Sequence, residues 1–115
     1  MIERFEGGKR LSQAVAAEGL VFLAGQVAGN GKASVQDQTR EVLANVEALL
    51  AKAGSSKANI LSVTVYLANI ADFAAMNEVY DAWLDRANLP TRACVEARLA
   101  DPDLRVEIVV VAARG

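Results

Sequence analysis

The sequence predicts an α+β domain in which two helices cover one face of a β-sheet. Two segments have apolar residues at helical spacing, and the other segments alternate apolar and polar residues or are rich in β-branched residues, as strands are. In chain order the elements are β-β-α-β-α-β-β, which predicts one sheet of five to six strands. The chain has 115 residues, the usual length of one domain, so we expect a single core over residues 1–115.

Residues 12–27 predict a β-hairpin that is followed by a long helix. A turn-like Glu18-Gly19 pair precedes the apolar run 20–24, and the glycine-rich run 29–31 ends the hairpin. Ser34 then predicts a helix N-cap, and Gly54 predicts the end of that helix. The apolar stripe of the helix comprises Val35, Val42, Leu43, Val46, Leu49 and Leu50.

Residues 60–67 predict a strand, because they are dominated by β-branched and aromatic side chains. Asp72 stands where the N-cap of a second helix is expected, and Asn88 and Pro90 mark its end. The apolar stripe of this helix comprises Phe73, Met76, Val79, Tyr80, Trp83 and Leu84.

Residues 90–99 and 104–112 predict the last two strands, which we expect to pair as a hairpin through residues 100–103. From Ile108 onward the last strand has no polar face, which is typical of a strand buried on both sides. Two helices can cover only one face of the sheet. We therefore expect another copy of the chain to cover the other face and predict a homo-oligomer.

The composition is that of a globular protein and argues against two classes of partner. Apolar residues make up 53% and charged residues 23% of the chain. The net charge is −2 with both signs scattered, so we expect no nucleic-acid partner. No apolar run approaches the ~20 residues of a membrane span, and residues 1–6 do not resemble a signal peptide. We expect a cytoplasmic protein without a membrane partner.

The residue types also limit the chemistry. One cysteine excludes an intrachain disulfide, and one cysteine without histidine leaves too few ligands for structural zinc. The absence of histidine removes the commonest general base and the Ser-His and Cys-His pairs of nucleophilic catalysis. Any reaction must therefore use other side chains, the backbone or water.

Arg92 is the first candidate for a functional residue, in a stretch whose odd positions are apolar and whose even positions are polar. One interpretation is a solvated strand face on which Arg92, Glu96 and Arg98 form weak surface ion pairs. The other is a clamp for a carboxylate, because the planar guanidinium offers a rigid fork of donors that matches two carboxylate oxygens.

Glu107 is the second candidate, since it is a carboxylate among apolar residues and could exchange a proton with substrate or water. The alternative interpretation is that Glu107 forms a simple ion pair with Arg105 or Arg98. Cys94 is interpreted as a small buried hydrophobe and not as a nucleophile.

Several separated motifs resemble the RidA/YjgF (Rid) family of reactive-intermediate imine deaminases, which is also described as endoribonuclease L-PSP-like. The run Pro90-Thr91-Arg92-Ala93-Cys94-Val95, followed by Val106-Glu107-Ile108, is similar to the C-terminal signature of that family. The run Leu23-Ala24-Gly25-Gln26-Val27 resembles its "SGQ" strand, and Asn77-Glu78-Val79-Tyr80-Asp81-Ala82-Trp83 resembles its "NxxYxxF" helix.

The resemblance implies a chorismate-mutase-like fold with one mixed sheet, assembled as a homotrimer with clefts between subunits. It implies hydrolysis of 2-imino or enamine acids to 2-keto acids and ammonia, without metal or cofactor. By the same resemblance, Arg92 holds the substrate carboxylate, Glu107 positions the attacking water, and Cys94 and Gly25 line the cleft. Asn77 is implied to reach in from the neighbouring subunit.

Two positions depart from the pattern of deaminating members. Leu11 stands where the resemblance implies a tyrosine, and Val109 where many relatives have a second glutamate. Alternatives therefore stay open: a non-catalytic small-carboxylate-binding or protein-interaction member of the family, or a related hydrolase acting on another imine-like metabolite.

Overall fold

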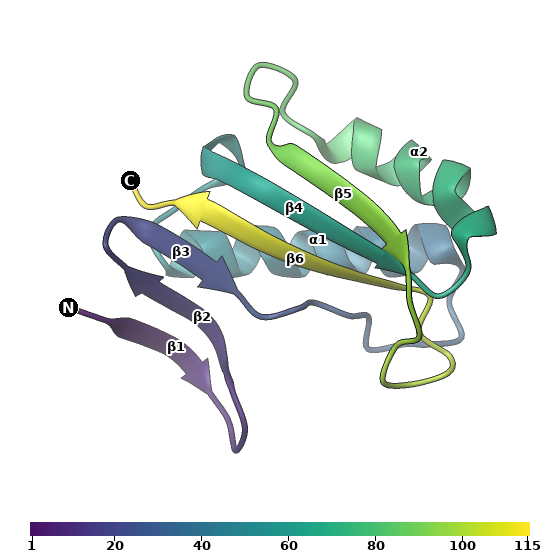
Figure 1. The fold of residues 1–115 in the computed structure, drawn as a ribbon, viewed down its shortest axis with the longest axis horizontal. Coiled ribbons are helices and arrows are strands. Elements are labelled where there is room, and N and C mark those ends of the chain that lie inside the picture. Colours follow the sequence, from purple (N-terminus) through teal and green to yellow (C-terminus); the bar gives the residue numbers. More distant parts are fainter.

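The computed structural model describes residues 1–115 and confirms the α+β architecture, with two helices on one face of a single mixed sheet (Figure 1). Two short 3-10 turns accompany the regular elements, at Lys57–Asn59 and Ile70–Asp72. In chain order the helices and strands are β1 (Glu3–Gly7), β2 (Ser12–Ala17), β3 (Leu20–Leu23), α1 (Val35–Lys52), β4 (Ile60–Leu67), α2 (Phe73–Trp83), β5 (Thr91–Glu96) and β6 (Val106–Ala113).

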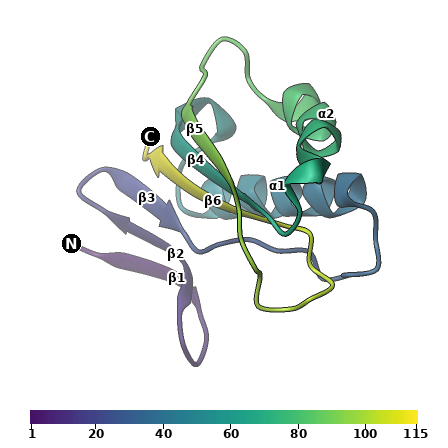
Figure 2. The same ribbon diagram turned by 45° about the vertical axis from the view of Figure 1, so that its right-hand side comes forward.

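The sheet has the order β1-β2-β3-β6-β4-β5, and only the β4/β5 pair is parallel. The predicted hairpin of the last two strands is therefore wrong, because β4 lies between β5 and β6. Residues 97–105 cross the end of β4 instead, visible as the yellow-green loop of Figures 1 and 2. Two backbone hydrogen bonds pin this crossing to the end of β4: Ala97 N–H donates to Leu67 O, and Ala68 N–H donates to Arg105 O.

Strand β1 is absent from the predicted element order. It pairs antiparallel with β2 at the edge of the sheet, and it is exposed except for the half-buried Phe5. An edge strand with one apolar anchor shows little of the alternation that marks strands in a sequence. The predicted turn between β2 and β3 is confirmed, since Glu18 and Gly19 both have positive φ, at 54° and 77°.

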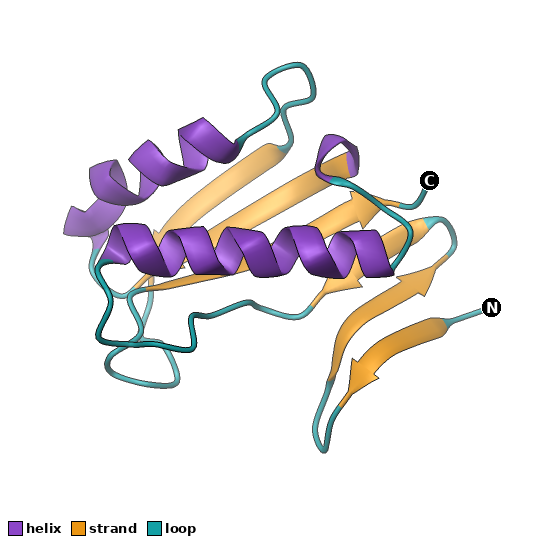
Figure 3. Cartoon of the chain, turned by 180° about the vertical axis from the view of Figure 1, so that it is seen from behind, coloured by secondary structure: helices purple, strands orange, loops and turns teal.

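Helices α1 and α2 pack against each other and against the same face of the sheet (Figure 3). The predicted cap of α1 is confirmed, because Ser34 Oγ accepts a hydrogen bond from Asp37 N–H at 3.1 Å. Asp72 lies at the N-cap position of α2, as predicted, but its side chain accepts no hydrogen bond from a helix amide and binds Arg105 instead. No helix combines the length and the hydropathy that crossing a membrane would require.

The other face of the sheet has no helix over it, and Figure 1 looks onto this face with α1 behind the sheet. Strand alternation places an apolar set of side chains here, because β4 and β6 bury their other side against the helices. This open face includes Val15, Phe22, Tyr66, Val95, Val109 and Val111.

Candidate functional site

Arg92 projects from β5 on the helix-covered side of the sheet. It lies opposite the buried Val63 of the parallel neighbour β4, and residues paired across a ladder share one face. Since β5 is the edge strand beside α2, the Arg92 side chain extends towards that helix.

Three side chains of α2 surround the guanidinium. Arg92 Nη1 donates a hydrogen bond to Asn77 Oδ1 at 2.7 Å. The guanidinium carbon lies 4.7 Å from the ring centroid of Tyr80 and 5.7 Å from that of Phe73. These contacts leave Arg92 half-buried with no carboxylate partner, because it takes part in none of the five ion pairs.

The solvated-face interpretation of residues 90–99 therefore fails for Arg92. Glu96 does not pair with it, since the Glu96 carboxylate accepts a hydrogen bond from Ile70 N–H at 2.9 Å. Arg98 is exposed and forms no ion pair, as a surface residue would. A half-buried guanidinium without a countercharge is the arrangement expected of an anion site.

Glu107 projects from β6 onto the open face, opposite Tyr66 of β4. It forms no ion pair, because Arg105 is bound to Asp72, with Nη2 to Oδ1 at 2.9 Å and Nε to Oδ2 at 3.2 Å. The alternative in which Glu107 pairs with Arg105 or Arg98 is therefore wrong.

Gly25 lies directly against Glu107. A Cβ built on Gly25 would overlap Glu107 Oε2 and would lie 2.9 Å from Glu107 Cδ. Glycine thus leaves room for this carboxylate in its present position, and a larger side chain would have to displace the flexible end of Glu107.

The five candidate residues form two groups on opposite faces of the sheet. Arg92, Asn77 and Cys94 lie on the helix side, whereas Glu107 and Gly25 lie on the open side. Asn77 meets Arg92 of its own chain, so this contact needs no neighbouring subunit.

The distance along and across the sheet also separates the two groups. Arg92 is opposite Val63 and Glu107 is opposite Tyr66, so the two positions are three residues apart along β4, or about 10 Å. They are two strands apart across the sheet, which adds roughly 10 Å in that direction.

Cys94 lies two residues after Arg92 on the same face and is half-buried. Burial raises the pKa of the Cys94 thiol, and the nearby Arg92 charge only partly opposes that shift. The thiol is therefore protonated at neutral pH, which agrees with its interpretation as a small hydrophobe.

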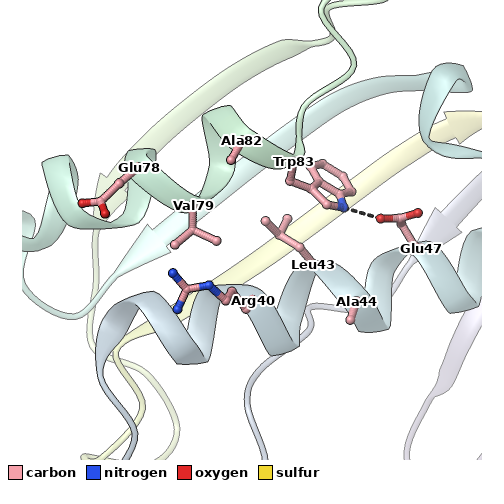
Figure 4. A pocket seen from close by; sticks show the side chains of 8 residues that line it. All are labelled: Arg40, Leu43, Ala44, Glu47, Glu78, Val79, Ala82 and Trp83. Atoms are coloured by element: carbon pink, nitrogen blue, oxygen red, sulfur yellow. Dashed lines mark hydrogen bonds between the residues drawn. The ribbon is translucent and has the colours of Figure 1, made fainter.

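None of the three hollows in the chain is lined by the five candidate residues. The largest, of about 530 Å³, lies between α1 and α2 (Figure 4). Its charged residues are mostly engaged already: Arg40 with Asp37, and Glu47 with the indole N–H of Trp83. No cluster of three or more Cys, Asp or Glu side chains is placed to hold a metal ion.

Phe73 and Tyr80 were not predicted as neighbours of Arg92. Their spacing predicted only the apolar stripe of α2, and Tyr80 is indeed buried in the core. The available signal was Asn77, a polar residue on the helix between them, at spacings of four and three residues.

Comparisons with known proteins agree with this fold over the whole chain. The family model described as endoribonuclease L-PSP matches residues 1–114. A RutC family protein from Haemophilus ducreyi is 42% identical over 113 residues, covering 98% of this chain and 97% of that protein. An Escherichia coli protein provisionally named reactive intermediate deaminase TdcF is 38% identical over 110 residues, covering 90% of this chain and 85% of that protein.

Among solved structures, a member of the YjgF protein family from Neisseria meningitidis superposes with a TM-score of 0.97. It is 46% identical, and the match covers 100% of this chain and 96% of that one. The fold, the family model and these identities lead to one conclusion: the chain belongs to the RidA/YjgF family.

Proposed function

We propose that this protein hydrolyses 2-imino acids and their enamine tautomers to 2-keto acids and ammonia, without a cofactor. The observation that supports this best is Arg92, a half-buried guanidinium held by α2 with no carboxylate partner in the chain. Only one of its five N–H groups has an acceptor, so the others are available to a ligand carboxylate. The naming of a relative as a reactive intermediate deaminase agrees with the proposal.

The chemistry suits a site without histidine. Arg92 binds the carboxylate and thereby fixes the adjacent imine carbon, which is already electrophilic when its nitrogen is protonated. Glu107 accepts a hydrogen bond from one water, whose oxygen then adds to that carbon. As the C=N bond becomes a C–N bond, the water gives one proton to Glu107, which passes it to the nitrogen. The C–N bond then breaks and ammonia leaves, while the remaining hydroxyl proton is lost to solvent as the C=O bond of the 2-keto acid forms. Most of the rate enhancement is then a matter of orientation.

Arg92 and Glu107 of one chain cannot both contact such a substrate. The carboxylate and the imine carbon are directly bonded, whereas the two side chains leave opposite faces of the sheet and their backbones are offset by about 10 Å in each of two directions. In the proposed site, Arg92 and Asn77 of one copy therefore face Glu107 and Gly25 of a neighbouring copy.

This sharing supports a cyclic assembly, and we propose a homotrimer with one cleft at each subunit contact. A contact that joins two different surfaces is head-to-tail, and repeating it closes a ring. In a two-fold dimer, each copy would have to meet the same partner through both faces of its sheet at once, although those faces point in opposite directions. The exposed apolar residues of the open face, such as Phe22 and Val95, would be covered in this assembly.

The activity is tested by generating an imino acid with an amino-acid oxidase and following its decay. We expect the wild-type protein to accelerate the decay over solvent, and Arg92→Ala to remove the acceleration. Arg92→Lys is expected to restore little, because an ammonium group cannot bind a carboxylate through two parallel hydrogen bonds. Full activity in Arg92→Ala would contradict the proposal, as would the absence of acceleration by the wild type.

The shared site has its own test, which uses two inactive variants, Arg92→Ala and Glu107→Gln. The two are mixed one to one, unfolded and refolded together so that subunits exchange. About one cleft in four then combines an intact Arg92 with an intact Glu107, so roughly a quarter of the wild-type activity should return. If each site lay within one chain, the mixture would stay inactive.

A second candidate function, binding of a small carboxylate or of a protein without hydrolysis, is favoured by Leu11. This residue is exposed, and it offers no hydroxyl to a water where the resemblance implies a tyrosine. Thermal stabilisation by 2-keto acids without imine turnover would support carboxylate binding. Turnover confined to another imine-like compound would instead identify a related hydrolase.

A further inference from the structure

We propose that Phe73 and Tyr80 are positioning residues that hold the Arg92 guanidinium between their rings, so that a carboxylate can bind only along the free edge of its plane. This inference rests on the proposed function for its ligand class, but the arrangement of the three side chains belongs to the free protein. We call Phe73, Asn77 and Tyr80 the α2 clamp.

The helix spacing supports the clamp. Phe73, Asn77 and Tyr80 occupy positions i, i+4 and i+7 and therefore share one stripe of α2. Phe73 and Tyr80 are seven residues apart, which is about 10.5 Å along the axis. The guanidinium carbon lies 5.7 Å from the ring centroid of Phe73 and 4.7 Å from that of Tyr80, so both rings are within cation–π distance of one guanidinium.

The three contacts fix different degrees of freedom of the guanidinium. Aromatic faces attract a cation and limit how far its plane can tilt. The Asn77 Oδ1 bond to Nη1 limits rotation within that plane. Arginine normally loses considerable rotamer freedom when it binds a ligand, so a guanidinium already ordered in the free protein loses less.

The two rings of the clamp differ in exposure. Phe73 lies at the first position of α2 and is 42% exposed, so burial of its ring contributes little to the stability of the fold. The role of the Phe73 ring is therefore its contact with Arg92 and not burial in the core. Tyr80, by contrast, is 3% exposed and is anchored by the core, so it forms the fixed wall of the clamp.

The ligand test measures the affinity for 2-ketobutyrate by calorimetry. We expect Phe73→Leu to weaken binding by about 3- to 30-fold, the range of one cation–π contact. Tyr80→Leu should do the same and Tyr80→Phe should restore most of the affinity, because the ring and not the hydroxyl contacts Arg92. Ile70→Ala, which removes a comparably exposed apolar side chain just before α2, serves as the control.

Two further measurements separate positioning from general damage to the fold. The methyl ester of 2-ketobutyrate has no carboxylate, so Phe73→Leu should leave its weak binding unchanged. In an Arg92→Ala background, Phe73→Leu should have no further effect on 2-ketobutyrate, since both changes act through the same group. Equal losses for acid and ester, or additive losses, would overturn the inference.

A measurement without ligand keeps the clamp testable even if the proposed function fails. In the free protein the Arg92 side-chain protons should show ring-current shifts in nuclear magnetic resonance spectra, assigned by their loss in Arg92→Lys. Phe73→Leu should move these signals towards random-coil values, and Ile70→Ala should not. Unchanged signals in Phe73→Leu would overturn the clamp whatever the imine assay gives, whereas shifted signals without imine turnover would support the clamp and count against hydrolysis.

Discussion

Gln38 is a fully buried polar side chain that ties together three segments around the start of β6. Its Nε2 group donates to Gly31 O and Asp103 O, each at 3.3 Å, and to Ala33 O at 3.1 Å. Its Oε1 accepts a hydrogen bond from Arg105 N–H at 2.9 Å. Helix α1, the loop before it and the loop before β6 thus meet at one amide with 0% exposure.

We predict that Gln38→Leu destabilises the protein by about 3 to 5 kcal/mol. Leucine has about the volume of glutamine, but it leaves one backbone N–H and three carbonyl groups without the Gln38 partner. Each unpaired buried group costs roughly 1 to 3 kcal/mol, and a carbonyl that keeps another hydrogen bond costs less. At about 2.1 cal/mol/K per residue, the unfolding entropy of 115 residues is roughly 0.24 kcal/mol/K. The Tm should therefore fall by about 12 to 20 °C.

The assay is thermal and urea unfolding at one fixed protein concentration, because assembly adds to apparent stability. Gln36→Leu is the matched control, since its side chain lies on the same helix, forms no hydrogen bond and is not buried. We expect that control to change the free energy of unfolding by less than about 0.5 kcal/mol. A loss of under about 1 kcal/mol in Gln38→Leu would refute the reasoning that these bonds hold the three segments together.

Three further predictions concern the site and its support. Gly25→Ala should lower kcat/KM for imine hydrolysis by roughly 10- to 100-fold at nearly unchanged Tm, because the new methyl group displaces the flexible end of Glu107; retained activity would place Glu107 outside the reaction. Cys94→Ala should keep most activity. The wild-type thiol should react with iodoacetamide more slowly than free cysteine at pH 8, because a raised pKa leaves less thiolate, and faster alkylation would contradict the burial argument. Asp72→Asn should cost about 1 kcal/mol in urea unfolding, since it removes the countercharge of Arg105, whose side chain is 43% exposed and therefore partly screened by solvent; a change within error would make that pair a surface contact in energetic terms.

Much of the fold could be predicted because its signals are local. The apolar stripe of α1, its Ser34 cap and the Glu18-Gly19 turn are each encoded within a few neighbouring residues. The strand order could not be predicted in the same way, since neighbours in sequence usually pair and nothing local shows that β4 enters between β5 and β6. Asp72 has the residue type of a cap, but its partner Arg105 is distant in sequence.

For the candidate site, candidate residues could be named from the sequence, but their arrangement could not be predicted. Alternation showed that Arg92 and Cys94 share a face, yet it could not show which face, because that depends on the register against β4. The separation of Arg92 from Glu107 likewise depends on β4 lying between their strands. The aromatic neighbours of Arg92 were hidden because a helix stripe that faces a charged group looks the same as one that faces the core.

The position of β6 has a consequence for how the molecule is made. This strand comes last in sequence among the six, yet it lies in the interior of the sheet between β3 and β4. Until residues 106–113 have been synthesised, the β1–β3 segment and the β4-α2-β5 unit have no strand to join them. The sheet can therefore be completed only after translation has passed this point, and the unjoined strand edges of β3 and β4 are the surfaces on which a chaperone would act.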